Sequence, residues 1–168
     1  MQGKLKRTYR ISSELTRKAD YIGEIPLLEM PRLTSLALNN EGVARVTFSF
    51  GFNVLNHAVI KGEYAADVEV ECQRCLEPMT QHIEQDFELL IDGSEEDIES
   101  FQVDSVYTSE GYLDVFEVIE DELILALPII MMHQDTSCNT YLQPQPQEVA
   151  VEKKDNPFAV LETLKGTN

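Results

Sequence analysis

Large apolar residues recur at every second position through the middle of the chain. Three stretches show this alternation, at residues 45–52, 58–70 and 79–91, and polar or charged residues fill most of the positions between. A spacing of two places one set of side chains on one face of a β-strand. One wet face is typical of antiparallel strands, because buried parallel strands are apolar throughout. The pattern therefore predicts an antiparallel β-meander whose outer face carries much of the acid.

Helical spacing appears on both sides of this meander. Residues 12–20 begin with two serines, which can cap a helix by accepting hydrogen bonds from early backbone N–H groups. Further along, apolar residues lie three or four positions apart, at Leu113, Phe116, Ile119, Leu123 and Leu127. Pro128 should end this second helix. Packing it over the apolar face of the sheet gives an α+β domain, an antiparallel sheet packed by a few helices.

Two segments between these elements lack a periodic pattern. Residues 25–32 contain Pro26 and Pro31, which have no backbone donor, so we expect an extended linker or an edge strand there. The acidic residues 92–100 predict a solvated loop.

The apolar pattern stops after residue 139. Residues 140–155 are rich in Gln and Pro and predict a disordered linker. Residues 156–166 begin with Asn-Pro and contain a glycine stop, which favours a short helix with Phe158 and Leu161 on one side. The prediction is a single domain over residues 1–139 followed by a flexible C-terminal tail. The short helix either docks on its own domain or is offered to a partner, with Phe158 and Leu161 as contacts.

Composition narrows the class of protein. The 168 residues are 43% hydrophobic, which is ordinary for one folded domain. No apolar run approaches the roughly 18 to 20 residues of a membrane span, and no apolar stretch follows the basic N-terminus as in a secretory signal. We therefore expect a cytoplasmic protein outside the membrane. Its three cysteines should be reduced thiols or metal ligands.

The charge is large and unevenly distributed. The chain has 13 basic and 30 acidic residues, a net charge of −17. Six of the basic residues and one acidic residue fall in the first 18 positions, so this arm carries +5 and the remaining chain −22. A body of that sign repels phosphate backbones and suits basic proteins. The alternative is that the acid serves only solubility.

The basic arm is the one segment suited to RNA or to an acidic partner. Its cations are Lys4, Lys6, Arg7 and Arg10, and Tyr9 lies among them as an aromatic ring that could stack on a base. A flexible terminus, or a strand paired with its own domain, explains the same residues equally well.

A Cys-x-x-Cys motif, Cys72 and Cys75, lies at the predicted tip between two long strands. Two such thiolates can bind tetrahedral zinc, and His133 with Cys138 would complete the four ligands. The wide separation of the two pairs along the chain favours the alternative, four unrelated side chains. Arg74, between the two cysteines, is a candidate RNA or partner contact. A thioredoxin-like redox role would need a helix N-terminus after the motif, which the sequence does not predict.

Enzyme motifs are missing from the sequence. It contains no Gly-x-Ser-x-Gly, no His-Glu-x-x-His and no glycine-rich phosphate loop. His57 and His82 fall in predicted strands without a nucleophile nearby. We predict that the protein is not an enzyme and has no catalytic residues.

Three blocks together resemble a known family: residues 70–78 around the two cysteines, residues 120–128, and residues 156–161. In order and spacing they are similar to the YceD-like family of large ribosomal RNA subunit accumulation proteins, over nearly the whole chain. The resemblance implies a role in the synthesis, processing or stability of 23S rRNA in the bacterial cytoplasm, and it implies no catalytic residues. Some relatives have more cysteines in the later region, where this chain offers only His133 and Cys138.

These observations give a leading function and alternatives. The leading one is a non-catalytic factor that acts through a basic ribosomal protein or a precursor of the large ribosomal subunit, with any 23S rRNA contact indirect. The alternatives are a direct RNA-binding module using the arm and the Cys-x-x-Cys hairpin, a zinc-binding structural adaptor, and a processing nuclease or redox enzyme.

Overall fold

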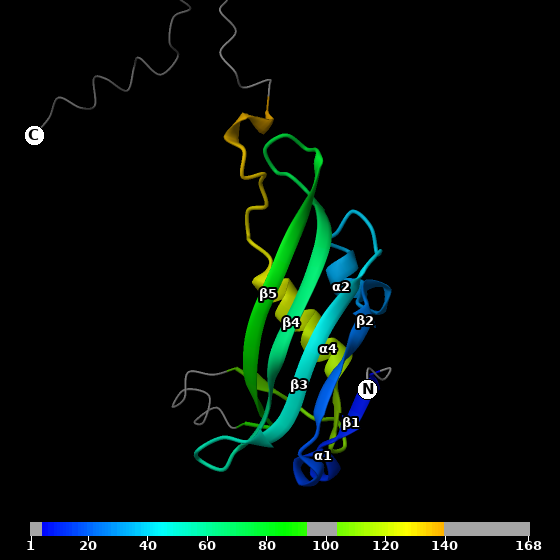
Figure 1. The fold of residues 1–168 in the computed structure, drawn as a ribbon, viewed down its shortest axis with the longest axis vertical. Coiled ribbons are helices and arrows are strands. Elements are labelled where there is room, and N and C mark those ends of the chain that lie inside the picture. The colour runs from blue at the N-terminus through cyan, green and yellow to red at the C-terminus, as the bar shows by residue number, and fades with distance from the viewer. Residues whose placement is uncertain (1–4, 94–103, 140–168) are drawn as a thin grey trace, which may run out of the picture. The chain divides into compact units, whose positions relative to one another are not determined.

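A five-stranded sheet forms the centre of the computed structural model, which describes residues 5–93 and 104–139 (Figure 1). Its strand order is β2-β3-β4-β5-β6, and all neighbours are antiparallel except the pair β5 and β6. The strands are β2 (Asp20–Pro26), β3 (Val43–Phe52), β4 (Ala58–Glu71), β5 (Pro78–Ile91) and β6 (Ser105–Val106). The predicted α+β class and the antiparallel meander are confirmed.

The remaining elements pack on one face of this sheet or at its ends (Figure 1). A second, two-stranded sheet joins β1 (Thr8–Arg10) to β7 (Tyr112–Asp114). The helices are α1 (Ile11–Arg17), η1 (Leu27–Glu29), α2 (Pro31–Thr34), α4 (Val115–Ala126) and η2 (Thr136–Cys138). In Figure 1, α4 crosses behind the sheet, and the opposite sheet face points toward the viewer. None of the helices in the described part is long and apolar enough to cross a membrane.

The core lies between the sheet and α4. Alternate residues of the long strands are buried there, as the spacing of two predicts, and Ile119 and Leu123 of α4 are fully buried against them. Phe48 of β3 lies opposite Gly62 of β4. A Cβ atom at Gly62 would come within 2.0 Å of the Thr47 carbonyl oxygen, so only glycine fits where these two strands approach.

A buried carboxylate joins two helices. Glu120 on α4 is buried, with only 5% of the residue's surface exposed. One of its oxygens accepts hydrogen bonds from the backbone N–H groups of Arg32 at 2.6 Å and Leu33 at 3.1 Å. The other oxygen accepts from the Arg32 Nε at 3.0 Å. These N–H groups lie in the first turn of α2, where backbone N–H groups have no acceptor within their own helix. Glu120 therefore acts as the cap of α2.

Several predicted boundaries differ from the structure. The first helix begins at Ile11, and the predicted serine cap is wrong because both serines lie inside the helix, whose N-cap, Arg10, makes no side-chain capping hydrogen bond. The second helix begins at Val115, since Leu113 pairs with Tyr9 in the small sheet. Asp114 caps this helix by accepting from the Glu117 N–H at 3.1 Å.

The prediction for residues 25–32 is half right. Pro26 does end an edge strand. Pro31, however, begins helix α2, so the segment is not extended throughout. A proline is tolerated at the first helical position because that N–H has no intrahelical partner.

Some predictions lie outside the described residues. These are the contact residues Lys4, Phe158 and Leu161, the linker 140–155, the helix 156–166 and most of the acidic loop 92–100.

Candidate metal centre

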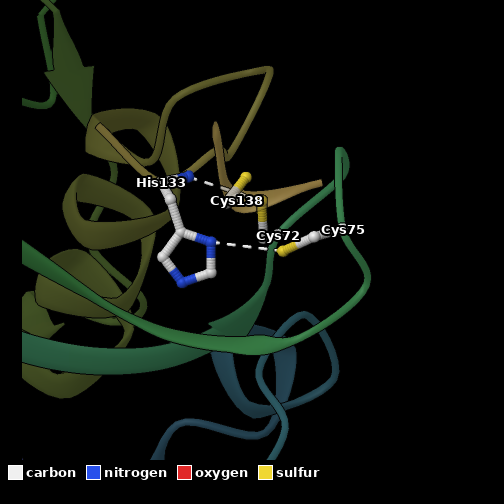
Figure 2. Close-up of side chains that lie close together, drawn as sticks. All are labelled: Cys72, Cys75, His133 and Cys138. Atoms are coloured by element: carbon white, nitrogen blue, oxygen red, sulfur yellow. Dashed lines mark hydrogen bonds between the residues drawn. The ribbon is translucent and has the colours of Figure 1, made fainter. Parts of the chain in front are cut away.

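Cys72 and Cys75 lie at the tip of the hairpin that joins β4 to β5, as predicted. The backbone N–H of Leu76 donates to the Cys72 carbonyl at 2.8 Å, and the Cys72 N–H donates to the Glu77 carbonyl at 3.0 Å. Leu76 closes the turn in the left-handed conformation, with φ of 63°. This tight turn brings the two thiols to the same side of the hairpin (Figure 2).

The other two candidate ligands arrive on the segment that follows α4. The backbone N–H of Gln73 donates to the Met131 carbonyl at 2.8 Å, which fixes this segment against the hairpin tip. The Arg74 guanidinium donates to the Asp135 carbonyl at 3.0 Å. The Asp135 carboxylate in turn accepts from the Ser137 N–H at 2.8 Å and shapes the turn that carries Cys138.

The four side chains point toward a common space (Figure 2). The ligand atoms of Cys72, Cys75, His133 and Cys138 all lie within 4.8 Å of one another, and the Cys75 sulfur is 3.3 Å from the His133 Nδ1. Tetrahedral zinc, with bonds of about 2.0 to 2.3 Å, needs ligand atoms roughly 3.3 to 3.8 Å apart. The group fits a metal ion after small adjustments. The four residues are thus neighbours, not the unrelated side chains that their sequence separation favoured.

Hydrogen bonds favour the thiolate form of Cys72. Burial alone would raise the pKa of this thiol, but backbone N–H groups of His133, Cys75 and Arg74 donate to it and lower the pKa to about 5. The pKa of Cys75 lies above its ordinary value. The Glu77 N–H donates to this thiol and lowers its pKa, but burial and the neighbouring thiols of Cys72 and Cys138 together outweigh that effect and raise it. The backbone N–H groups therefore favour the thiolate, which is the form of cysteine that binds metal ions.

Three thiols and an imidazole are a ligand set that suits zinc. An ion held by all four would have no open coordination position, which is the arrangement of structural zinc sites. The cysteines are all free, and Cys75 is followed by a turn and a strand instead of a helix. The geometry therefore lacks the helix N-terminus on which thioredoxin-like chemistry depends.

The described part of the basic arm packs on its own domain. Tyr9 is buried among Tyr21, Phe48 and Phe50, so its ring is covered and could not stack on a base. Arg7 donates to the Asp114 carboxylate at 2.8 Å and lies near Glu29. Lys6 and Arg10 are exposed. Of the two alternatives to an RNA contact, the strand paired with its own domain is the arrangement seen.

The two histidines outside the centre lie at different places, one in a turn and one on a long strand. His57 lies in the turn between β3 and β4, not in a strand, and its backbone N–H donates to the Asn53 side chain at 2.9 Å. His82 lies on β5 with its Nδ1 2.7 Å from an Asp67 carboxylate oxygen. Hydrogen bonds to Asp67 and then Glu84 raise the pKa of His82.

Sequence reasoning missed exposed apolar residues on the two segments that carry the candidate ligands. Ile129 is 95% exposed, and Leu76 and Ile130 are also well exposed. The signal was present in the sequence, since the apolar run continues beyond Pro128, where the helix has ended.

A comparison with protein families supports the resemblance seen in the sequence. The model of a family described as large ribosomal RNA subunit accumulation protein YceD matches residues 60–165, more than half of the chain. The chain belongs to the YceD family. The matched span contains all four candidate metal ligands, whereas the basic arm lies before it.

A curated relative agrees with this assignment. The large ribosomal RNA subunit accumulation protein YceD of Haemophilus influenzae is 35% identical over 170 residues, which cover 96% of this chain and 97% of the relative. No solved structure matches the chain.

Proposed function

We propose that this YceD family member is a non-catalytic cytoplasmic factor in the synthesis, processing or stability of 23S rRNA, acting through a ribosomal protein or a precursor of the large subunit. The observation that carries the proposal is the family membership, because the Haemophilus influenzae relative is named for the accumulation of large-subunit ribosomal RNA. The candidate metal centre, with four protein ligands, supports a structural role over a catalytic one.

Charge supports contact through a protein. The net charge of −17 opposes binding to bare phosphate backbones, and ribosomal proteins rich in lysine and arginine supply the opposite sign. The basic arm could offset this charge locally, but its Arg7 forms ion pairs with Asp114 and Glu29 of its own domain.

The test removes the gene from the bacterium that carries it. We expect a lower ratio of 23S to 16S rRNA, restored by the full chain, and we expect the tagged chain to sediment with precursor large subunits. An unchanged rRNA ratio together with sedimentation only as free protein would refute the proposal.

A second candidate function is a zinc-binding structural adaptor, which the grouping of three thiols and one imidazole favours. The measurement is the metal content of the full chain purified without chelators. We expect about one zinc per chain for the native sequence and for His57→Gln, and almost none for His133→Gln. The His57 variant is a matched control, because its side chain lies outside the group. Equal zinc in the two variants, or none in the native chain, would exclude the adaptor.

A further alternative is a direct RNA-binding module that uses the arm and the Cys-x-x-Cys hairpin. It is tested by titrating salt against binding of protein-free 23S fragments, with Lys4, Lys6, Arg7 and Arg10 changed to alanine. If the arm binds RNA, the salt slope should fall by roughly one for each phosphate that the variant no longer neutralises. We expect weak binding and an unchanged slope.

A further inference from the structure

The outer face of the sheet, opposite α4, is bare among the described residues (Figure 1). The register aligns its side chains in rows that cross from β2 to β5. One row is Glu24, Arg45, Ala65 and Glu84; the next is Ile22, Thr47, Glu63 and Asp86; the third is Asp20, Ser49, Lys61 and Glu88. Residues directly opposite one another in a sheet share a face, so each row lies together on this surface.

The outer face is strongly negative. It carries nine exposed carboxylates, at Asp20, Glu24, Glu63, Asp67, Glu69, Glu71, Glu84, Asp86 and Glu88. Among the described residues of strands β2 to β5, only Arg45 and Lys61 oppose them on this face, which leaves −7 with histidine counted as neutral. Like charges placed side by side on a sheet are unfavourable. A partner of opposite charge would relieve this repulsion.

The same face is hollowed over these three rows. A hollow of about 540 Å³ spans the first two rows, and a second of about 370 Å³ spans the third. They share Thr47 and Glu63, so they adjoin. The small side chains of Thr47, Ser49 and Ala65 stand between longer charged ones in these rows. We call this surface the outer groove.

We propose that the outer groove binds a lysine- and arginine-rich segment of a partner protein. The inference rests on the proposed function and names the surface that carries it out. Long cationic side chains suit this shape, because their aliphatic stems can cover the small residues of the floor while the charged ends reach the flanking carboxylates.

The same observations disfavour other occupants. Nucleic acid carries the sign of the groove itself. A second copy of the chain would set one −7 face against another and be repelled. An apolar segment would find Ile22 as its only exposed large apolar contact among the groove residues.

The first experiment measures binding of a synthetic peptide of repeated Lys-Arg-Gly-Ala units to the full chain. The groove variant carries Glu24→Gln, Glu63→Gln and Asp86→Asn. The matched control carries Glu41→Gln, Glu110→Gln and Glu117→Gln, three exposed acids away from the outer groove. Both variants lose the same charge. At physiological salt we expect about a tenfold loss of affinity for the groove variant and less than about twofold for the control. Equal losses would mean that only net charge matters and would overturn the proposal.

The second experiment identifies the occupant in cells. A photo-crosslinking amino acid replaces Thr47 in the groove or, as a control, the exposed Tyr107. We expect Thr47 to yield a crosslink to a basic protein that is absent with Tyr107. A crosslink to RNA or to a second copy of the chain would overturn the proposal.

The two proposals fail in different ways. If the groove variant still sediments with precursor large subunits and restores 23S rRNA, the groove is excluded and the proposed function stands. If the native chain itself neither sediments with precursors nor supports 23S rRNA, the proposed function fails, and with it the assignment of the groove.

Discussion

The two hairpin tips of the sheet are built in opposite ways. The tip between β3 and β4, residues 53–57, is closed by its own residues. The Asn53 side chain accepts from the N–H groups of Leu55 and His57, and the Asn53 N–H donates to the His57 carbonyl at 3.0 Å. The tip between β4 and β5, residues 72–77, also has a local turn, but it is joined to residues 129–138 from much later in the chain.

The difference indicates that the first tip only connects two strands, whereas the second belongs to a candidate functional site. A turn that satisfies its own backbone needs no remote partner, and its exposed Val54 and Leu55 imply nothing further. The second tip gathers ligand atoms and backbone donors from two distant segments around Cys72. Such an assembly of thiols is expected where a metal ion or a partner has to be held.

The largest expected effect is at the second tip. Changing Cys72 to serine removes a buried ligand and the thiolate to which three backbone N–H groups donate. We expect loss of bound zinc and fast amide hydrogen exchange over residues 129–138, with residues 53–57 unchanged. The melting temperature should fall by about 2 to 4 °C for each kcal/mol lost. Unchanged exchange over residues 129–138 would show that the segment is held without the centre.

A smaller effect is expected at the first tip. Asn53→Ala removes the acceptor for two backbone N–H groups, which water can partly replace, so we expect a loss of about 1 kcal/mol in the free energy of unfolding. Asn53→Asp keeps the acceptor and is the control. Denaturant unfolding gives the stability, and metal content should remain unchanged. A fall in zinc binding with Asn53→Ala would disprove the independence of the two tips.

A third comparison concerns backbone strain, because both tips contain a residue with positive φ. It is Asn56 at the first tip and Leu76 at the second. Leucine in this conformation costs roughly 1 kcal/mol, whereas asparagine tolerates it better. In Leu76→Gly the relief of this strain is partly offset by the larger conformational entropy that glycine loses on folding, so the free energy of unfolding should stay unchanged or rise by about 0.5 kcal/mol. Asn56→Gly should change the free energy of unfolding little. A large loss with Leu76→Gly would show instead that its exposed side chain makes a contact in solution.

The smallest effect is pH dependent and lies on the stem of the second hairpin. Asp67, and then Glu84, raise the pKa of His82 above its usual value. Because the pKa of His82 is raised in the folded state, its protonated ring stabilises the folded protein through these two carboxylates. This stabilisation is complete below the unfolded-state pKa of about 6.5 and is lost as the pH rises through the folded-state pKa. In an NMR titration, Asp67→Asn should lower the pKa of His82, whereas Asp20→Asn, at the other end of the outer face, should not. Equal shifts would assign the effect to general charge.

Long periodic segments are the part of the fold that the sequence predicted well. Strands β3, β4 and β5 run for ten or more residues, so the alternation of apolar and polar positions has room to show. Strands β1, β6 and β7 have two or three residues each, too few for any period. Helix α2 was missed because its stability comes from Glu120, a residue of a different helix.

The candidate site was predictable in its residues but not in its assembly. The Cys-x-x-Cys spacing and its place between two strands gave the hairpin tip directly. The approach of His133 and Cys138 to the two hairpin cysteines depends on the backbone hydrogen bond from Gln73 to Met131, which has no local sequence signature. The outer groove was also foreseeable only in part, since alternation predicted an acidic face but not the alignment of small residues across strands.

The contact between Glu120 and helix α2 has a consequence for the order in which the protein can form during its own synthesis. Glu120 follows Arg32 by 88 residues, and Asp114 follows Arg7 by 107. The meander can pair as it emerges from the ribosomal exit tunnel, because its hairpins are local. Strand β1 lacks its strand partner until β7 has left the tunnel, and α2 lacks Glu120 until α4 has left. Until then, these N-terminal elements of the nascent chain lack the contacts that complete them in the folded protein.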